Sequence, residues 1–183
     1  VFSPDGSRVA FVARKGDLWR VVVDGKPGPE YDLWTSVMGD PVFSPDGSRI
    51  AYTVRKGDKE RVVVDGKPGP EYDGIMPGEP VFSPDGSRVA YAVRKGDLWR
   101  VVVDGKPGPE YDWIEKGSLV FSPDGSRVAF VARKGDLWRV VVDGKPGPEY
   151  DWIGKGGPTF HPDGSLEYLA GRDGVLYRVK HLP

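Results

Sequence analysis

The sequence is an array of one repeated unit, and this feature constrains the fold more than any other. The segment Val1–Asp32 recurs without a single change as Val120–Asp151, and edited copies fill the space between them. One phenylalanine marks the start of each copy, at Phe2, Phe43, Phe82, Phe121 and Phe160. A period of about 40 residues is typical of stacked units that share a core. We therefore predict one domain, 1–183, with repeats 1–41, 42–80, 81–119, 120–158 and a partial repeat 159–183.

Each repeat contains the signals of four short antiparallel strands. In the fourth copy, the apolar run 119–122 is closed by a Pro-Asp-Gly turn. The runs 127–133 and 137–142 are apolar on both faces, as in strands that are covered on two sides. An Asp-Gly hairpin signal follows, and the proline-flanked segment 148–153 is predicted to be the outer strand of the same unit.

Sheets that are apolar on both faces must be sandwiched between copies of one another. A linear stack would expose a large apolar face at each end, whereas a closed ring exposes none. We therefore predict an all-β fold, a β-propeller of about five blades. Helical repeats of similar period are disfavoured, because proline or glycine interrupts the pattern every six to ten residues.

The repeated motifs are similar to those of a known family. The segments VFSPDGSRVAF, VFSPDGSRIAY, VFSPDGSRVAY and TFHPDGSLEYL resemble the signature of the WD-repeat-like propellers found in TolB and in many bacterial multi-blade proteins. This resemblance covers essentially the whole chain. It implies blades whose Phe-Ser-Pro-Asp-Gly segment is innermost and whose Tyr-Asp segment is outermost. The family contains docking platforms and hydrolase-associated propellers, so the resemblance implies a fold more firmly than an activity.

The fifth copy leaves the closure of the ring open. It stops after a third strand and lacks the segment that ends the other copies. The ring closes by face packing alone around four complete blades and one three-stranded blade, or the chain is an arc of a larger ring that a second chain completes. In the second case the chain would self-associate through the incomplete last blade, and in the first it would be a monomer.

Composition argues against several partners. The 26 basic and 27 acidic residues nearly cancel, so no strong global field attracts nucleic acid or an anionic membrane. No apolar run approaches the roughly 18 residues that span a bilayer. Cysteine is absent, which excludes disulfides and thiolate chemistry and gives no indication of the cellular compartment.

The repeated acidic residues and the two histidines do not form a catalytic or metal-binding pattern. Aspartates before glycine in tight turns routinely bond local backbone, so we expect a structural role for Asp5 and its equivalents and no metal or other cofactor. Histidine occurs only at His161 and His181. His161 replaces the serine of the other copies beside the inner turn, which makes it a candidate channel residue or a tolerated substitution. No nucleophile elbow or phosphate loop is present, so we predict no enzymatic activity.

The segments between copies vary most, and loops on a rigid scaffold concentrate binding residues. The candidate residues for a partner-binding rim are Trp34, Met38, Met76, Glu79, Glu115 and Lys116. The second copy also has Lys59-Glu60 where the others have Leu-Trp. This change predicts a strand that has slipped toward solvent or a groove for a partner.

Three functions are consistent with the sequence. The first is a non-catalytic scaffold that presents a loop face or central channel to a protein or small ligand. The second is a purely structural array, recently amplified or engineered, because even surface lysines are copied between repeats. The third is the accessory propeller of a hydrolase whose catalytic domain is absent.

Overall fold

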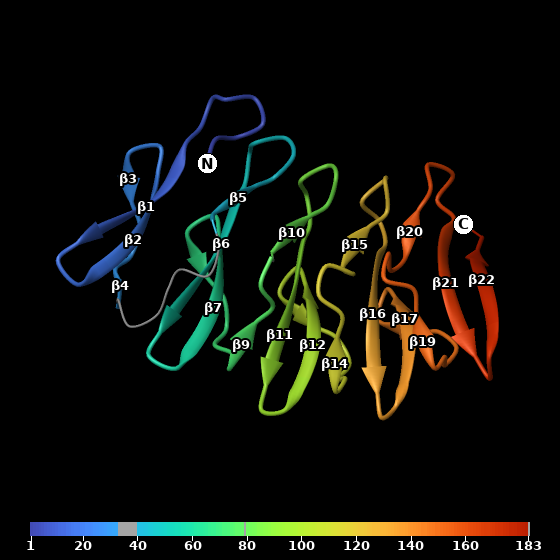
Figure 1. Ribbon diagram of the computed structural model, residues 1–183. Coiled ribbons are helices and arrows are strands. Elements are labelled where there is room, and N and C mark those ends of the chain that lie inside the picture. The colour runs from blue at the N-terminus through green and yellow to red at the C-terminus, as the bar shows by residue number, and fades with distance from the viewer. Residues whose placement is uncertain (33–39, 79, 183) are drawn as a thin grey trace.

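The chain folds into five β-sheets, which we call blades 1 to 5 (Figure 1). The structure is a computed structural model that describes residues 1–32, 40–78 and 80–182, and all of its regular elements are strands. Within these ranges no helix is available to cross a membrane. The all-β fold and the number of five blades are confirmed.

Each blade has two long central strands, with shorter strands on both sides in blades 2 to 4 and on one side in blades 1 and 5. Blade 1 contains β1 (Ala10–Lys15), β2 (Leu18–Val23), β3 (Lys26–Pro27) and β4 (Tyr31–Asp32). Blade 2 contains β5 (Val42–Phe43), β6 (Ile50–Lys56), β7 (Lys59–Val64) and β8 (Lys67–Pro68). Blade 3 contains β9 (Gly74–Ile75), β10 (Val81–Phe82), β11 (Val89–Lys95), β12 (Leu98–Val103) and β13 (Lys106–Pro107). Blade 4 contains β14 (Trp113–Ile114), β15 (Val120–Phe121), β16 (Val128–Lys134), β17 (Leu137–Val142) and β18 (Lys145–Pro146). Blade 5 contains β19 (Trp152–Ile153), β20 (Thr159–Phe160), β21 (Leu166–Arg172) and β22 (Val175–His181).

The predicted outer strand is divided between two blades. Tyr150 forms a bridge with Trp138 and so belongs to blade 4, whereas β19 pairs with β21 of blade 5. The prediction that 148–153 is one outer strand is therefore wrong in its second half. The chain crosses at Asp151, whose amide donates to the Gly171 carbonyl (2.8 Å) and whose carboxylate accepts from the Asp173 amide (2.8 Å). These two hydrogen bonds fasten the crossing to the next blade.

The innermost strand of a blade consequently has two pieces with a bulge between them. In blade 4, β14 and β15 both pair with β16, at Arg133–Ala132 and at Ala129–Val128 respectively. The intervening residues bulge outward, and the Ser118 hydroxyl fills the gap by accepting from the Val131 amide (3.0 Å). The linker between repeats is therefore part of the inner edge of the blade.

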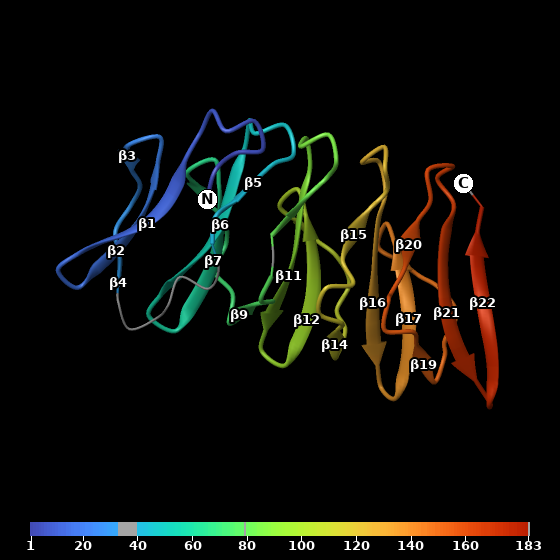
Figure 2. The same cartoon turned by 45° about the horizontal axis from the view of Figure 1, so that its top comes forward.

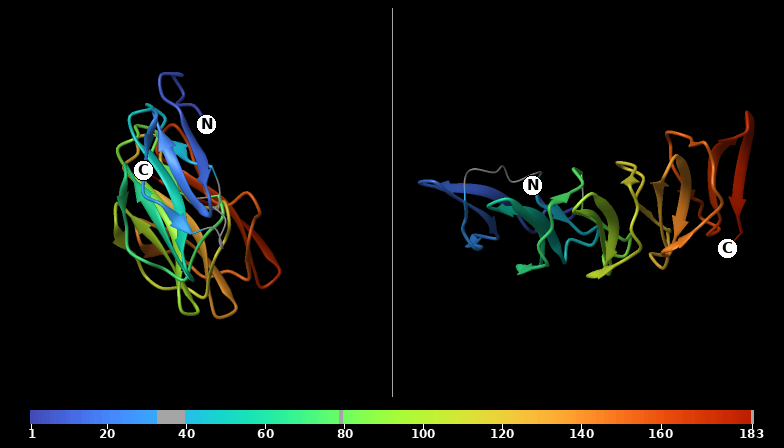
Figure 3. Two further views of the ribbon diagram at one scale, coloured as in Figure 1. Left: turned by 90° about the vertical axis from the view of Figure 1, so that its left-hand side faces the viewer. Right: turned by 90° about the horizontal axis from the view of Figure 1, so that it is seen from below.

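The blades form an open row and not a closed ring (Figures 1 and 2). They follow one another in sequence order, and blades 1 and 5 lie at opposite ends of the row (Figures 1 and 3). Of the two arrangements that the sequence allows, the structure has the arc. Face packing between neighbouring blades does not bring blade 5 back to blade 1.

The hydrophobic core lies between blades, as the two-sided apolar strands predict. At the junction of blades 3 and 4, Ala92 and Tyr111 of one blade pack against Phe130 and Ala132 of the next. The Tyr111 and Phe130 rings meet edge to face with centroids 6.0 Å apart. Similar clusters occupy the other junctions. Each blade is thus stabilised by its neighbours, and a terminal blade has only one.

We expect identical residues in identical repeats to differ in their contribution to stability. Phe130 is 2% exposed between blades, whereas its equivalent Phe11 is 47% exposed on the outer face of blade 1. Phe130→Ala should lower the free energy of unfolding by about 3–5 kcal/mol, because it leaves a cavity in the core. Phe11→Ala should cost about 1 kcal/mol or less. Urea unfolding of dilute protein checks both values, and equal losses would contradict the open row.

Candidate interaction surfaces

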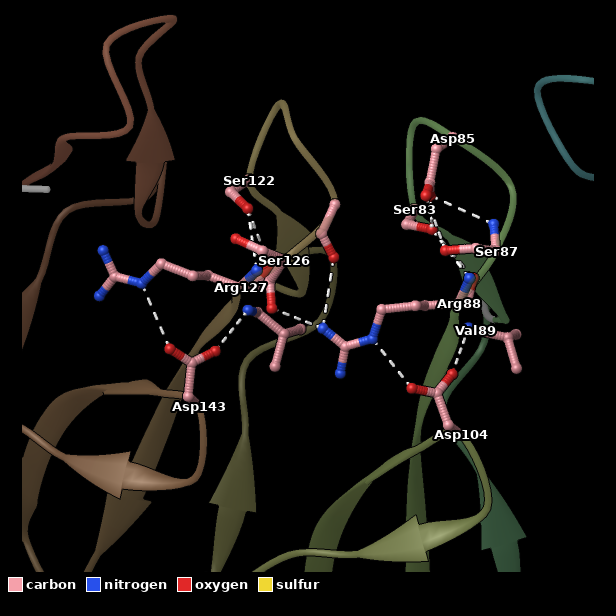
Figure 4. A network of polar contacts seen from close by, with 12 residues as sticks. Ser83, Asp85, Ser87, Arg88, Val89, Asp104, Ser122, Ser126, Arg127 and Asp143 are labelled. Carbon is pink, nitrogen blue, oxygen red and sulfur yellow. Dashed lines mark hydrogen bonds and ion pairs between the residues drawn. The ribbon is translucent and has the colours of Figure 1, made fainter.

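The Pro-Asp-Gly turns hold their aspartates in local hydrogen bonds. In blade 3 the Ser83 hydroxyl and the Ser87 amide both donate to Asp85, the latter over 3.2 Å (Figure 4). The Ser83 hydroxyl in turn accepts from the Arg88 amide (2.9 Å). Asp85 therefore closes the turn, as the position of aspartate before glycine predicts. Among the described residues no three His, Asp or Glu side chains are grouped to hold a metal ion.

These hydrogen bonds stabilise the charged form of the carboxylates and so lower their pKa values. Bonds from Ser3 and Ser7 lower the pKa of Asp5 to about 2, and bonds from Ser122 and Ser126 lower the pKa of Asp124 to about 2. The pKa values of the equivalent aspartates Asp46, Asp85 and Asp163 are lowered for the same reason, chiefly by the neighbouring serine hydroxyls. The ionised aspartates are thus part of the folded turns.

In blades 1 to 3, a second set of aspartates joins the blade to the next one through an arginine. Asp104 accepts from the Val89 amide (3.0 Å) and from Arg88 Nε (2.9 Å) within blade 3 (Figure 4). Arg88 Nη1 then donates to the carbonyls of Ser126 (2.7 Å) and Gly125 (3.3 Å) in blade 4. We call this arrangement the arginine clasp. It positions two blades with respect to one another by charge-assisted hydrogen bonds.

Shallow grooves repeat beside the clasps. Grooves of about 380, 510 and 550 Å³ lie at the junctions of blades 3 and 4, 1 and 2, and 2 and 3. Each is lined by the clasp arginine and by the Lys-Pro-Gly segment that follows the third strand. Because the same residues line all three, these grooves belong to the repeat and do not mark one specialised site.

The Lys59-Glu60 change in blade 2 produces neither of the predicted features. The register of the strands is kept, with Arg55 opposite Glu60 as Arg94 is opposite Trp99. Glu60 is only 3% exposed, so it lines no open groove. Its Oε2 accepts from the amide of Ile75 (2.7 Å) in blade 3, and Arg55 Nε lies 3.5 Å from its Oε1. Glu60 is a buried connection between blades.

The reason for this substitution lies in the next blade. In the following junction Trp99 packs edge to face on Trp113, with ring centroids 5.6 Å apart. The residue that corresponds to Trp113 one blade earlier is Gly74, which has no side chain to stack. A pair of tryptophans is therefore replaced by a glutamate and a glycine, and the glutamate bonds to the backbone next to that glycine. Sequence reasoning missed this because the two positions lie in different repeats.

The predicted rim is only partly visible and does not form one surface. Trp34, Met38 and Glu79 lie outside the described residues. Met76 is 3% exposed and packs in the core between blades 3 and 4, so its assignment to an accessible rim is wrong. Its apolar side chain fills the junction directly after the crossing. Glu115 and Lys116 are exposed, on the bulge of the inner strand of blade 4.

His161 lies at the end of the inner strand of blade 5. Its main chain closes the turn by donating to Ser165 (2.8 Å) and accepting from Gly164 (2.9 Å). Its side chain is half-exposed, with Nε2 at 3.6 Å from the Glu167 carboxylate. Because the described blades form an open row, this edge of blade 5 is not enclosed as a channel. His161 is therefore on an open edge beside an acidic partner.

The exposed apolar side chains gather at the two ends of the row. Blade 1 exposes Val1, Phe2 and Phe11, and blade 5 exposes Leu169, Val175, Leu176 and Tyr177. In the inner blades the corresponding faces are covered by a neighbour. Sequence reasoning missed these surfaces because it favoured a closed ring. The shortened fifth copy was the signal that could have indicated them.

Several solved structures are similar to this chain at low sequence identity. No family model and no curated protein matches the chain. Among solved structures, TolB from Acinetobacter baumannii is similar with a TM-score of 0.48 and 17% identity over 99% of this chain and 50% of that one. The Dos1 propeller gives 0.49 and 11% over 97% and 52%, and the Cps50 (Swd1) propeller domain of Myceliophteria thermophila gives 0.46 and 12% over 95% and 67%.

The chain thus spans about half the length of the TolB and Dos1 structures. The strand pairing alone defines the architecture of this chain, a row of sheets built from repeated blades as the motifs imply. What this chain does must be argued from its own surfaces, because a fold of this kind supports many functions.

We expect the buried carboxylate of Glu60 to matter more than an exposed one. Glu60→Ala should lower the free energy of unfolding by about 1–3 kcal/mol, because the buried Ile75 amide loses its acceptor. The matched control is Glu71→Ala in the same blade, which removes a half-exposed ion pair with Arg61 and should cost about 1 kcal/mol or less. Chemical denaturation measures both. Equal costs would show that Glu60 is not a structural link.

We also expect stability to fall in acid as the turn aspartates take up protons. The folded pKa of Asp124, about 2, is below its ordinary value, so its contribution is complete above about pH 4 and is lost as the pH falls toward 2. Asp124→Asn should therefore lower the melting temperature at pH 6, and this deficit should shrink toward zero near pH 2. Calorimetry at both pH values tests this. A deficit that does not change with pH would contradict it.

Proposed function

We propose that this chain is a non-catalytic scaffold that binds protein partners through the outer face of blade 1, at one end of its row of blades. The observation that carries this proposal is the exposure of two aromatic side chains on the outer face of blade 1, Phe2 at 74% and Phe11 at 47%. Contiguous exposed apolar surface, rimmed by polar residues, is typical of protein-binding sites. The charged loops along the row keep the rest of the surface polar.

The inner edge is a weaker candidate for the same role. Glu115 and Lys116 project there from blade 4, and His161 lies on the same edge of blade 5. These side chains are polar and adjoin no large exposed apolar surface of their own, although Trp113 and Trp152 are partly exposed nearby. In the binding of a protein partner, these polar side chains would contribute specificity, and buried apolar surface would contribute most of the affinity.

A photo-crosslinking experiment tests the proposal. The full chain carrying p-benzoylphenylalanine in place of Phe11 is mixed with an extract of the cells that make it, and the same probe at the exposed position Lys26 is the control. We expect a discrete protein adduct from position 11 and none from position 26. No adduct at position 11, or identical adducts at both positions, would reject binding through this face.

A second candidate function, self-association through the last blade, has one specific observation in its favour. In blades 1 to 4 the second long strand also pairs with a Lys-Pro strand, whereas β22 pairs only with β21 among the described residues. An edge strand of this kind offers free amides and carbonyls to another chain. Light scattering over a range of concentrations tests this, with Leu176→Lys as the variant that should block it. A mass that stays monomeric throughout would reject it.

A further inference from the structure

The arginine clasp has a direction, from each blade to the one that follows it. Beyond its hydrogen bonds, the Arg88 guanidinium lies over the ring of Phe121 in blade 4, 5.5 Å from the centroid. Arg8 and Arg49 repeat the contact toward Phe43 (5.2 Å) and Phe82 (5.5 Å). Both also reach the carbonyls of the next turn, at Gly47 (3.0 Å) and Ser48 (2.7 Å), and at Gly86 (3.4 Å) and Ser87 (2.6 Å). Blades 2, 3 and 4 therefore each present a phenylalanine ring and two carbonyls to the arginine of the preceding blade.

The turns pack as closely as the clasps require. A Cβ atom at Gly125 of blade 4 would lie 2.9 Å from the Asp85 carboxylate of blade 3, which is closer than real contacts allow. Glycine at this position thus permits the two turns to touch. The face of a blade that receives its predecessor is consequently a shaped surface of ring, carbonyls and glycine.

Blade 1 has this receiving face, and nothing in the described chain covers it. Phe2 is 74% exposed, whereas its equivalent Phe43 is 9% exposed beneath a clasp. Phe11 is 47% exposed, whereas Phe130 is 2% exposed. A Cβ atom at Gly6 would meet no atom within 4 Å. The complete set of receiving groups is present in blade 1 and available.

Blade 5 has lost the group that would reach such a face. Blade 4 has Ser126 and Arg127 between its turn glycine and Val128, whereas blade 5 has Ser165 alone before Leu166. The strand registers show that Leu166 takes the place of Val128, since each lies opposite the phenylalanine of its own inner strand. The missing residue is therefore the clasp arginine.

The outer face of blade 5 is also charged where the other blades are apolar. By the same registers, Glu167, Arg178 and Lys180 occupy the positions of Ala129, Val140 and Val142. Glu167 and Arg178 form an ion pair over 2.6 Å. In repeat proteins a polar outer face is the property of a terminal capping unit. Covering this face would remove those charges from water, which is costly.

We propose that the outer face of blade 1 is a docking surface for a partner that presents the arginine-bearing face of a propeller blade, and that blade 5 is a cap that excludes a second copy of this chain from that role. This proposal rests on the proposed function and makes it specific. The occupant is inferred from the three clasped junctions of this chain, where the same receiving face already binds that chemistry. A second copy could offer only blade 5, which lacks the arginine.

The test restores the lost face in the full chain. The restored variant has an arginine inserted between Ser165 and Leu166 together with Glu167→Ala, Arg178→Val and Lys180→Val. Sedimentation velocity should show the original chain as a monomer over a broad range of concentrations. The restored variant should form head-to-tail assemblies in which the average mass at least doubles. Adding Phe2→Asp to the restored variant should weaken assembly by about tenfold or more, because the ring beneath the guanidinium is lost.

Two further measurements keep the outcome unambiguous. A variant with the inserted arginine alone should assemble more weakly than the restored variant and more strongly than the original chain, and it covers the case that the multiple change fails to fold. Circular dichroism confirms that each variant is folded. A folded restored variant that stays monomeric would overturn the proposal, and so would head-to-tail assembly of the original chain or assembly that Phe2→Asp leaves unchanged.

Failure here is distinguishable from failure of the proposed function. If the restored variant does not assemble but the probe at position 11 still captures a protein, the end face binds partners and the arginine-bearing blade is the wrong occupant. If a dimer of the original chain forms and Phe2→Asp abolishes it, the occupant is a second copy, which also overturns the proposal.

Discussion

The structure depends on face-to-face burial of sheets that are apolar on both sides. Neither central strand of a blade has a polar face, so an isolated blade would leave two apolar surfaces in water. Stacking removes those surfaces in every inner blade, and the valine-rich strands, the tyrosines and Met76 of one linker all pack in these junctions. Burial of apolar surface has no direction of its own, and the hydrogen-bonded turns and clasps supply the directional contacts between blades. They determine which faces meet and at what offset.

Much of this architecture could be predicted from residues alone, because the deciding signals are local. Proline, aspartate and glycine at fixed offsets specify turns, and Asp143 and Gly144 adopt the left-handed backbone that their hairpin requires, with φ of 51° and 77°. The alternation of apolar side chains in the central strands specifies that both of their faces are covered. The number and order of the blades follow from these two facts.

The errors arise where a residue acts across a repeat boundary. The sequence places Tyr150 and Trp152 in one segment, but the bonds of Asp151 send them to different blades. Met76 looks like a surface linker residue until the next blade is placed over it. Closure is a property of the whole row: small offsets at each junction add up, and no single repeat contains the information that blade 5 fails to meet blade 1. Candidate residues chosen for local variability could not include the end faces, since identical residues are buried in one copy and exposed in another.

Because each clasp arginine contacts the blade that follows its own, the position at which a new repeat is added determines whether it can pack in the row. Each of the first four repeats carries a receiving phenylalanine near its start and, a few residues later, the arginine that contacts the next blade. A unit duplicated within the row therefore carries both the receiving phenylalanine and the clasp arginine. It can be inserted between two existing units without changing either end of the row. Insertion of a unit in the middle of the row would reproduce the existing junctions between blades. Addition of a unit after blade 5 would instead place the charged side chains of blade 5 against an apolar sheet. The first four copies are nearly identical and the last one diverges, which is the pattern that duplication within the row would produce.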